Sequence, residues 1–321
     1  MNTIHYSKYT ANGNNFVILD EIKKEYIPES EKSQFSKIIC HETTGIGCDT
    51  LIIIQRYNKD VLKKIYGNEH KDTITNTHQN KFIMRVFERD GSESHNCGNG
   101  LICLGHHLRH TYLVEDASIA TEIPSMKPFF RQIKSLDNQI TQATLGAARI
   151  PDKNFITPDA IQTIFKNNNV CLLKKITIAL KQDNKNEKMT FTQCYATFTG
   201  EPHIVIFESH PHINNKIFNQ QDGEKLFDMI GLQFNQLKKI FPQGINISFA
   251  KIIDDGKIAY RCFERGVNRE TFACGTGATA VANIARELEL TTKNDITILP
   301  WRARQEPQYA NAEIIIKNNN G

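Results

Sequence analysis

Long apolar runs, a strong charge of either sign and closely paired cysteines are all missing from this 321-residue sequence. No apolar stretch approaches the ~20 residues that a membrane-spanning helix requires. The first residues, MNTIHYSKYTANGNN, contain no apolar segment of the kind found in secretory signals. Lys and Arg number 39 and Asp and Glu 35, and a net charge of only +4 does not indicate binding to nucleic acid or to a membrane surface. We therefore expect a cytosolic protein.

The cysteines argue against two common structural uses of thiols. There are eight of them, none in a Cys-x-x-Cys motif and none in a Cys/His cluster with zinc-finger spacing, which disfavours a structural zinc site. A disulfide framework is not expected in a cytosolic chain of this length. His70 and His78 lie in a polar stretch, residues 57–81, that we predict to be a loop without a metal. Most of the thiols should be buried, and the eight positions are Cys40, Cys48, Cys97, Cys103, Cys171, Cys194, Cys262 and Cys274.

Apolar patterning predicts a mixed α/β (α+β) protein. A hydrophobic content of 40% suits a folded chain, and the length suits one large domain or two ordinary ones. Asp255-Gly256 predicts a hairpin turn, and residues 183–188 are expected at the tip of another hairpin. Amphipathic spacing predicts helices over residues 30–41, 100–110, 223–241 and 276–290. Short apolar runs predict strands over residues 16–19, 51–54, 82–87, 176–180, 204–207, 258–263 and 296–299.

An internal repeat carries most of the functional information. Residues 85–100 read RVFERDGSESHNCGNG, and residues 261–277 read RCFERGVNRETFACGTG. Both predict a strand, a polar turn, Cys-Gly-x-Gly and then a helix. Because more than half of the chain separates the two copies, we expect two similar halves, residues 1–122 with Cys97 and residues 123–321 with Cys274.

Cys-Gly-x-Gly at a helix start has a specific chemistry. The first N–H groups of a helix lack partners and carry partial positive charge, so they bind a carboxylate and also stabilise a thiolate. A single copy would most simply be a buried cysteine in a glycine-rich turn. Two matched copies, at Cys97 and Cys274, predict a thiolate base and a thiol acid on opposite faces of one carbon, as stereoinversion requires.

At these residues the sequence resembles diaminopimelate epimerase, a family of cofactor-independent amino-acid epimerases and racemases. The family's Cys-Gly-Asn-Gly is present at residues 97–100, and its Glu-Arg-Gly and Ala-Cys-Gly-Thr-Gly are present at residues 264–266 and 273–277. Its Gly-Asn-Asp-Phe-Val is similar to GNNFV at residues 13–17, and its Thr-Gly-Ile-Gly-x-Asp to TGIGCD at residues 44–49. The matches keep the family's order and extend over most of the chain.

The resemblance implies a fold, a site and a set of residue roles. The fold would have two pseudo-symmetric halves, each with strands wrapped around a central helix, and the active site in the cleft between them. Cys97 and Cys274 would be the acid and base, with His203 near the thiols and Glu264 meeting the substrate's α-ammonium. The resemblance implies neither pyridoxal phosphate nor a metal. It does imply a homodimer and a place in lysine biosynthesis. Backbone N–H groups would hold the α-carboxylate, at Gly98, Asn99, Gly275 and Thr276, and Asn14, Asn246 and Arg265 would contact the distal end.

Two departures from the family pattern bear on the substrate. The family's Phe-Asn-Ala-Asp-Gly is here Phe-Glu-Arg-Asp-Gly, which places Glu88 where an asparagine stands, and its Gly-Asn-Pro-His is Gly-Glu-Pro-His, which places Glu201 at the second asparagine. In the family, both asparagines belong to the pocket for the distal end of diaminopimelate. An added acid in that pocket would repel the distal carboxylate of the substrate. The nominal substrate pair is LL- and meso-diaminopimelate. A substrate with a cationic or imidazole side chain (Lys, ornithine, Arg or His) is the alternative, unless the two acids face solvent or pair with basic residues such as Arg89. The retained Arg265 suits a distal carboxylate, unless one of the two acids neutralises it.

Two further classes of function stay open beside the epimerase. Cys97 and Cys274 would form a regulatory disulfide in a thiol redox protein, although the lack of Cys-x-x-Cys counts against it. A non-catalytic ligand-binding relative on the same fold is the third class. The retained cysteine pair opposes it, because binding alone requires neither thiol.

Overall fold

The computed structural model describes residues 3–67, 80–136, 141–182, 185–207, 217–218 and 223–317. The chain divides into two compact units, Met1–Gly146 and Ala147–Gly321. The boundary lies at Gly146 and not at residue 122, because β7 (Phe129–Ser135) pairs with β6 (Asp116–Thr121) and so extends the first sheet. His70 and His78 lie outside the described residues.

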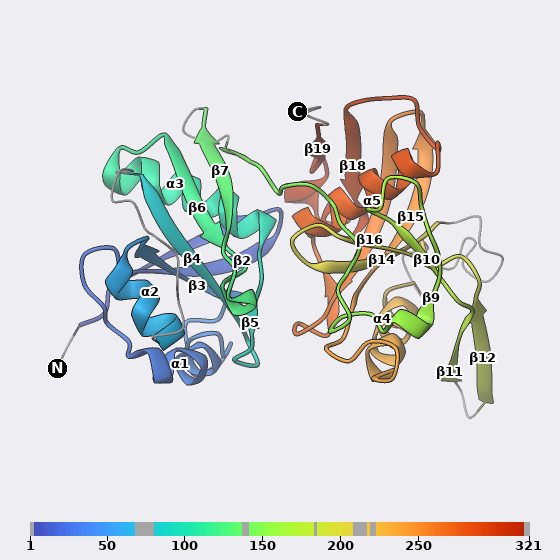
Figure 1. The fold of residues 1–321 in the computed structure, drawn as a ribbon, viewed down its shortest axis with the longest axis horizontal. Helices are drawn as coiled ribbons and strands as arrows, with labels where there is room; N and C mark the ends of the chain where they lie inside the picture. Colours follow the sequence, from blue (N-terminus) through green and yellow to red (C-terminus); the bar gives the residue numbers. More distant parts are fainter. Residues whose placement is uncertain are drawn as a thin grey trace. The chain divides into compact units, whose positions relative to one another are not determined.

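Unit 1 contains one sheet with the strand order β1-β2-β3-β4-β6-β7-β8, and β5 pairs with β4 at its end. The helix α1 lies between β2 and β3 in the chain, and α3 between β5 and β6 (Figure 1). The remaining strands are β1 (Tyr6–Ala11), β2 (Asn14–Asp20), β3 (Thr50–Arg56), β4 (Lys81–Glu88), β5 (Glu93–Ser94) and β8 (Thr141–Ala143), and the helices are α1 (Lys32–Ile39), α2 (Lys59–Tyr66) and α3 (Gly98–Tyr112).

Unit 2 contains a sheet with the order β19-β18-β16-β15-β14-β13-β10-β9, and β17 pairs with β16. A separate hairpin, β11 (Ile176–Gln182) and β12 (Lys185–Phe191), packs against α4 (Gly223–Gln236). The other strands are β9 (Ile161–Ile164), β10 (Cys171–Leu173), β13 (Tyr195–Phe198), β14 (Pro202–Phe207), β15 (Asn246–Asp254), β16 (Lys257–Glu264), β17 (Arg269–Thr271), β18 (Ile296–Pro300) and β19 (Ile314–Ile316), and the other helices are α5 (Gly275–Glu287) and α6 (Trp301–Arg304).

The two units repeat one plan, as the internal sequence repeat predicts. In unit 1, β2 and β3 are parallel, β4 is antiparallel to β3, β5 returns along β4, and α3 leads into β6, which is parallel to β4. In unit 2, β14, β15, β16, β17, α5 and β18 follow in the same order with the same directions. The expected pseudo-symmetric pair of α+β halves is therefore confirmed.

Each unit curls its sheet around one buried helix. The helix α3 contacts β1 and β2 near one edge of its sheet and β7 and β8 at the other, and α5 contacts strands from β13 to β19. Leu101, Leu104 and Leu108 of α3 are fully buried against the strands. The buried positions of α5 are largely alanine and glycine, and small side chains let a strand approach a helix closely on every side. The prediction of strands wrapped around a central helix is confirmed.

Most of the predicted elements are present. The strands predicted from apolar runs are β2, β3, β4, β11, β14, β16 and β18, and the Asp255-Gly256 hairpin joins β15 to β16. The four predicted helices are α1, α3, α4 and α5. The predicted hairpin tip is shorter than expected, because β12 begins at Lys185.

The prediction of a loop over residues 57–81 is wrong over its first part. Residues Lys59–Tyr66 form α2, which begins at Asn58, whose side chain accepts a hydrogen bond from the Val61 N–H. Leu62 is fully buried with Ile83 and Ile123, so the segment contributes to the core in spite of its polar composition. The N-cap asparagine is the sequence signal that indicates this helix.

A half-buried polar cluster joins α3 to the first two strands. The Asp20 carboxylate accepts a hydrogen bond from the Tyr112 hydroxyl (2.8 Å) and lies 3.0 Å from His107 Nε2. Tyr9 Oη lies 3.3 Å from His107 Nδ1. Burial raises the pKa of Asp20, but the hydrogen bonds from His107, from the Ile22 N–H and from Tyr112 outweigh burial, and the net pKa is lowered.

Replacing Asp20 by Asn should lower the free energy of unfolding by about 1–3 kcal/mol at neutral pH, because a charged acceptor is lost from a half-buried network. A carboxyl with a lowered folded pKa stabilises the fold above its ordinary pKa of ~3.9, and the contribution disappears as the pH falls through the folded value. Urea unfolding of wild type and Asp20→Asn at pH 7 and at pH 3 tests this. The difference should shrink at the lower pH, and the exposed control Asp116→Asn should show little effect at either; an equal difference at both pH values would contradict the assignment.

Candidate active site

The two repeated cysteines have the same backbone position, the N-cap of a buried helix. Cys97 precedes α3 with φ −142° and ψ 110°, and Cys274 precedes α5 with φ −124° and ψ 113°. In each case Sγ accepts a hydrogen bond from the second glycine of Cys-Gly-x-Gly, at 3.4 Å from Gly100 N and 3.4 Å from Gly277 N. The sequence repeat is therefore also a repeat of local geometry.

The second glycine of each motif is required by close packing. A Cβ at Gly100 would lie 2.9 Å from Ile52 Cδ1, and a Cβ at Gly277 would lie 3.1 Å from Cys262 Sγ and 3.3 Å from His203 Cε1. The glycines therefore allow each helix start to press against side chains of its own sheet.

An Arg–Glu pair precedes each cysteine; the pair in unit 2 is buried, and the pair in unit 1 is partly exposed at Glu93. The Arg85 guanidinium donates through Nε and Nη2 to both oxygens of Glu93, the second at 2.7 Å, and Arg261 donates in the same way to Glu270, with Nε 2.7 Å from Oε1. Each pair joins the strand that carries the arginine to the short return strand before the cysteine. The first arginine of the repeated Arg-x-Phe-Glu-Arg, Arg85 or Arg261, is the sequence signal for this pair.

The Arg261–Glu270 pair should be essential for stability. Replacing Glu270 by Gln leaves a guanidinium that is 3% exposed without its counter-charge, a change that costs about 3–5 kcal/mol. Chemical denaturation measures the loss. The matched control is Glu224→Gln, which removes the Arg302 pair in the same unit; since that glutamate is 47% exposed, about 0–1 kcal/mol is expected. Equal effects of the two variants would refute a special role for the buried pair.

Cys274 lies in an enclosed, sulfur-rich environment. The side chain is 6% exposed, and Sγ lies 3.3 Å from Thr276 Oγ1. A hydrogen bond with Cys262 and then burial raise its pKa well above the ordinary value, and they outweigh the lowering by Thr276 and the Gly277 N–H. The Gly277 N–H at the helix start does lower the pKa of Cys274, but the neighbouring thiol and burial have the larger effect. Cys97, in contrast, is only half-buried.

His203 is connected to Cys274 through a hydroxyl. Its Nε2 shares a hydrogen bond of 2.9 Å with Thr276 Oγ1, the same oxygen that contacts Cys274 Sγ, and lies 3.5 Å from Asn246 Nδ2. Burial lowers the pKa of His203 to about 3, so the imidazole is neutral at physiological pH. The predicted residues His203, Asn246, Thr276 and Cys274 therefore form one connected group within unit 2.

Glu201 neutralises Arg265. Glu201 Oε2 accepts from Arg265 Nε at 3.1 Å and from Nη2 at 2.6 Å, and the Arg265 N–H donates to Asn246 Oδ1 at 2.8 Å. Glu201 is 6% exposed, so it does not face solvent. The expectation that one of the two acids neutralises Arg265 is confirmed for Glu201, whereas Arg89 pairs with Glu42.

Glu88 and Glu264 are equivalent in the two repeats. Glu88 ends β4 and accepts from the hydroxyl of Ser94 on β5 at 2.7 Å and from that of Thr50 at 3.2 Å. Glu264 ends β16 and accepts from the hydroxyl of Thr271 on β17. Glu88 is 8% exposed, so it also does not face solvent. Each unit thus presents one carboxylate at the strand end that leads to its cysteine.

The remaining predicted residues lie at the helix starts and on one strand. Gly98 and Asn99 form the first turn of α3, and Gly275 and Thr276 the first turn of α5. The Asn12 side chain donates to Asn99 Oδ1 at 3.2 Å. Asn14 is buried at the start of β2. The predicted residues therefore form two sets, one in unit 1 (Cys97, Gly98, Asn99, Asn14 and Glu88) and one in unit 2 (Cys274, Gly275, Thr276, His203, Glu201, Asn246, Glu264 and Arg265).

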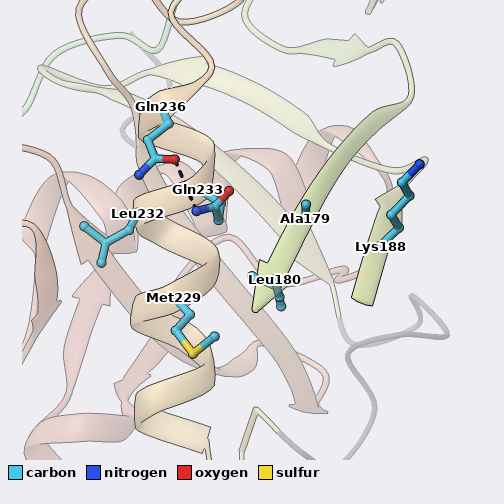
Figure 2. A pocket seen from close by; sticks show the side chains of 7 residues that line it. All are labelled: Ala179, Leu180, Lys188, Met229, Leu232, Gln233 and Gln236. Atoms are coloured by element: carbon cyan, nitrogen blue, oxygen red, sulfur yellow. Dashed lines mark hydrogen bonds between the residues drawn. The ribbon is translucent and has the colours of Figure 1, made fainter. Parts of the chain in front are cut away.

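A groove elsewhere in unit 2 contains none of these residues. Figure 2 shows it between α4 and the β11–β12 hairpin, with a volume of about 880 Å³. Of its lining residues only Lys188 is charged, so the lining offers no acid/base group resembling the thiols; the others are Ala179, Leu180, Met229, Leu232, Gln233 and Gln236.

Neither a metal site nor a membrane span is found in the described part of the chain. No three of its His, Cys, Asp and Glu side chains are grouped so that they would hold a metal ion. Among the same residues, no helix combines the length and apolarity that crossing a bilayer requires. None of the eight cysteines, all of which lie in the described residues, forms a disulfide.

Comparison with known proteins identifies relatives along almost the whole chain. The sequence model described as "Diaminopimelate epimerase" matches residues 6–127. The diaminopimelate epimerase of Methanothrix thermoacetophila is 30% identical over 299 residues, which cover 90% of this chain and 84% of that protein. The diaminopimelate epimerase of Methanocella arvoryzae is 30% identical over 294 residues, which cover 91% of this chain and 85% of that protein.

Solved structures share the fold at much lower identity. A hydroxyproline epimerase from Agrobacterium vitis, with bound trans-4-hydroxy-L-proline, has a TM-score of 0.56 at 10% identity and covers 91% of this chain and 79% of its own. A probable proline racemase from Agrobacterium radiobacter K84 has the same TM-score and identity and covers 92% and 81%. At this identity the likeness shows the fold alone.

Proposed function

The chain belongs to the diaminopimelate epimerase family, and we propose that it inverts Cα of diaminopimelate between the LL and meso forms with two thiols and no cofactor. Membership makes it an isomerase of the epimerase and racemase class, with a small-molecule amino-acid substrate. The observation that carries the two-thiol proposal is the matched N-cap geometry of Cys97 and Cys274. Ligand binding alone would need neither sulfur.

The proposed reaction moves one proton on each face of Cα. One thiolate removes the α-proton, and the second thiol donates its own proton to the opposite face of the carbanion, so the configuration inverts and the two sulfurs exchange protonation states. The mechanism requires each unit to contribute its cysteine to one substrate. The raised pKa of Cys274 favours this residue as the protonated thiol at rest, which leaves Cys97 as the resting base.

The surrounding groups support binding of an α-amino acid. N–H groups of the first helical turns, at Gly98, Asn99, Gly275 and Thr276, are suited to the α-carboxylate, because a helix start favours an anion. The Glu264 carboxylate is suited to the α-ammonium. A neutral His203, linked to Cys274 through Thr276, adds no competing charge beside the thiol. With neither metal nor pyridoxal phosphate in the proposal, the carbanion is stabilised by these fixed dipoles and by exclusion of water.

Replacing either cysteine should abolish epimerisation, but exchange of the α-proton should remain. Cys97→Ala and Cys274→Ala should each lose conversion of LL- to meso-diaminopimelate by at least ~10³-fold, because general acid–base catalysis at one face is removed. The remaining thiol should still exchange the α-proton of one stereoisomer. Chiral chromatography measures conversion, and mass spectrometry in deuterated water measures exchange.

The matched control is Cys194→Ala, which removes a fully buried thiol of unit 2 that has no proposed role. This variant should retain wild-type conversion when it is folded. If Cys97→Ala and Cys274→Ala both retained near wild-type conversion, the two-thiol mechanism would be refuted. Loss of activity on oxidation alone, with both single variants active under reducing conditions, would instead support the redox alternative.

An amino acid with a cationic side chain is the second candidate substrate. Glu201 pairs with the Arg265 guanidinium, the group best suited to bind a distal carboxylate. Glu88 adds a carboxylate at the position equivalent to Glu264. Both changes oppose a distal carboxylate and favour the side chain of Lys, ornithine, Arg or His.

Reversing the two departures should shift specificity toward diaminopimelate. In Glu88→Asn/Glu201→Asn, Arg265 is released from its partner, so kcat/KM for LL-diaminopimelate relative to the basic L-amino acids should rise by ~10²-fold. Glu42→Gln, which removes the exposed partner of Arg89, is the control and should leave the ratio unchanged. Efficient wild-type turnover of diaminopimelate, not improved in the double variant, would remove the second candidate and leave the family's substrate.

We also propose that the protein is a homodimer and that it acts in the cytosol. Reactive thiols require a reducing compartment, which supports the cytosol, and the resemblance to the family supports the dimer. Light scattering of the purified protein tests the oligomeric state.

A further inference from the structure

The hydroxyl of Tyr260 holds both backbone groups of Cys274. Tyr260 Oη accepts a hydrogen bond from the Cys274 N–H at 2.7 Å and donates to the Cys274 carbonyl at 2.9 Å. That carbonyl also accepts the first helical hydrogen bond of α5, from Ala278 N at 2.8 Å. One buried oxygen therefore fixes the residue that begins the helix and carries the sulfur.

Tyr260 is itself rigidly placed. It lies in β16 between Ala250 of β15 and Pro300 of β18, and its side chain is 1% exposed. Burial raises the pKa of the hydroxyl well above its ordinary value, so the group keeps the proton that it donates to the Cys274 carbonyl. The neutral hydroxyl is therefore held on a central strand, where it keeps the Cys274 backbone in one position.

The matched position in unit 1 is occupied differently. The residue before the arginine of Arg-x-Phe-Glu-Arg is Tyr260 in unit 2 and Met84 in unit 1, and Met84 packs in the apolar core with no hydroxyl to offer. The tyrosine is therefore not a requirement of the repeated fold, which forms in unit 1 without it.

We propose that Tyr260 is a positioning residue for Cys274: its hydroxyl fixes the Cys274 peptide and thereby directs Sγ toward the substrate carbon. The inference rests on the proposed two-thiol function. Because Sγ is one bond from Cβ, a tilt of the peptide moves the sulfur, and a displacement near 1 Å is enough to lower a rate by ~10²-fold.

Tyr260→Phe removes the hydroxyl and keeps the ring. We expect kcat for epimerisation to fall by ~10–100-fold with KM changed less than about 3-fold, because the sulfur acts in the transition state and does not hold the ground-state substrate. Tyr195→Phe, the same chemical change on β13 of the same sheet, is the control and should retain wild-type kcat. A wild-type kcat in Tyr260→Phe would overturn the proposal.

Selective alkylation provides a readout that does not depend on turnover. Iodoacetamide labelling followed by peptide mass spectrometry should show a rate at Cys274 changed at least 5-fold in Tyr260→Phe, with Cys171 and Cys194 of the same unit unchanged. Equal changes at all three would indicate general loosening of unit 2 and would overturn the positioning role. Tyr260→Met, which copies the unit 1 residue, is the second variant, and failure of both variants to fold would assign Tyr260 to folding instead.

A double variant separates this inference from the proposed function. In the Cys274→Ala background, Tyr260→Phe should have no further effect on the α-proton exchange that Cys97 catalyses, since the cysteine through which Tyr260 acts is gone. A further loss of exchange would overturn the inference and leave the two-thiol mechanism intact. Full epimerisation by Cys274→Ala itself would instead refute the proposed function.

Discussion

Each unit depends on one constraint, the burial of a helix inside a curled sheet. The sheet supplies apolar side chains to α3 and to α5 from several directions, but a buried helix also brings its unpaired first N–H groups into a low-dielectric environment. Cys97 and Cys274 each satisfy one of these groups through sulfur, and glycines let the backbone approach. The same helix start that is buried in the fold therefore also carries the N–H groups and the thiol to which we assign a role in the proposed function.

The two copies of this arrangement are not chemically equal. Cys97 is half-buried, whereas Cys274 is enclosed by Cys262, Thr276 and the Tyr260 hydroxyl. Enclosure raises the thiol pKa of Cys274 in spite of the helix start. Two cysteines in the same backbone setting thus have different surroundings, and in unit 2 these surroundings raise the pKa of the thiol. An acid and a base need such a difference if one substrate form is to react from the resting enzyme.

Local patterns predicted the elements and the two cysteines, but not the contacts that tune them. Apolar runs and the duplicated Cys-Gly-x-Gly are local, so the strands, α3 and α5 followed from sequence. The Tyr260–Cys274 hydrogen bonds join two different elements, and their existence depends on strand register. Neutralisation of Arg265 by one of the two acids was among the sequence-based alternatives, but the sequence did not indicate that Glu201 is the acid. The helix α2 was missed because its polar face dominates its composition and only Leu62 is fully buried.

Charge pairing would also affect which substrate the proposed site recognises. Glu201 removes the free positive charge of Arg265 without removing the side chain, so the guanidinium keeps its hydrogen bonds but offers a distal carboxylate less attraction. Glu88, held by the neutral hydroxyls of Ser94 and Thr50, adds negative charge by repeating the arrangement of Glu264 and Thr271. In the proposed mechanism the thiol chemistry depends on neither acid, because Cys97 and Cys274 are fixed by their helix starts and by their own sheets. On that proposal, substrate preference would change through these two carboxylates while the inversion chemistry stayed the same.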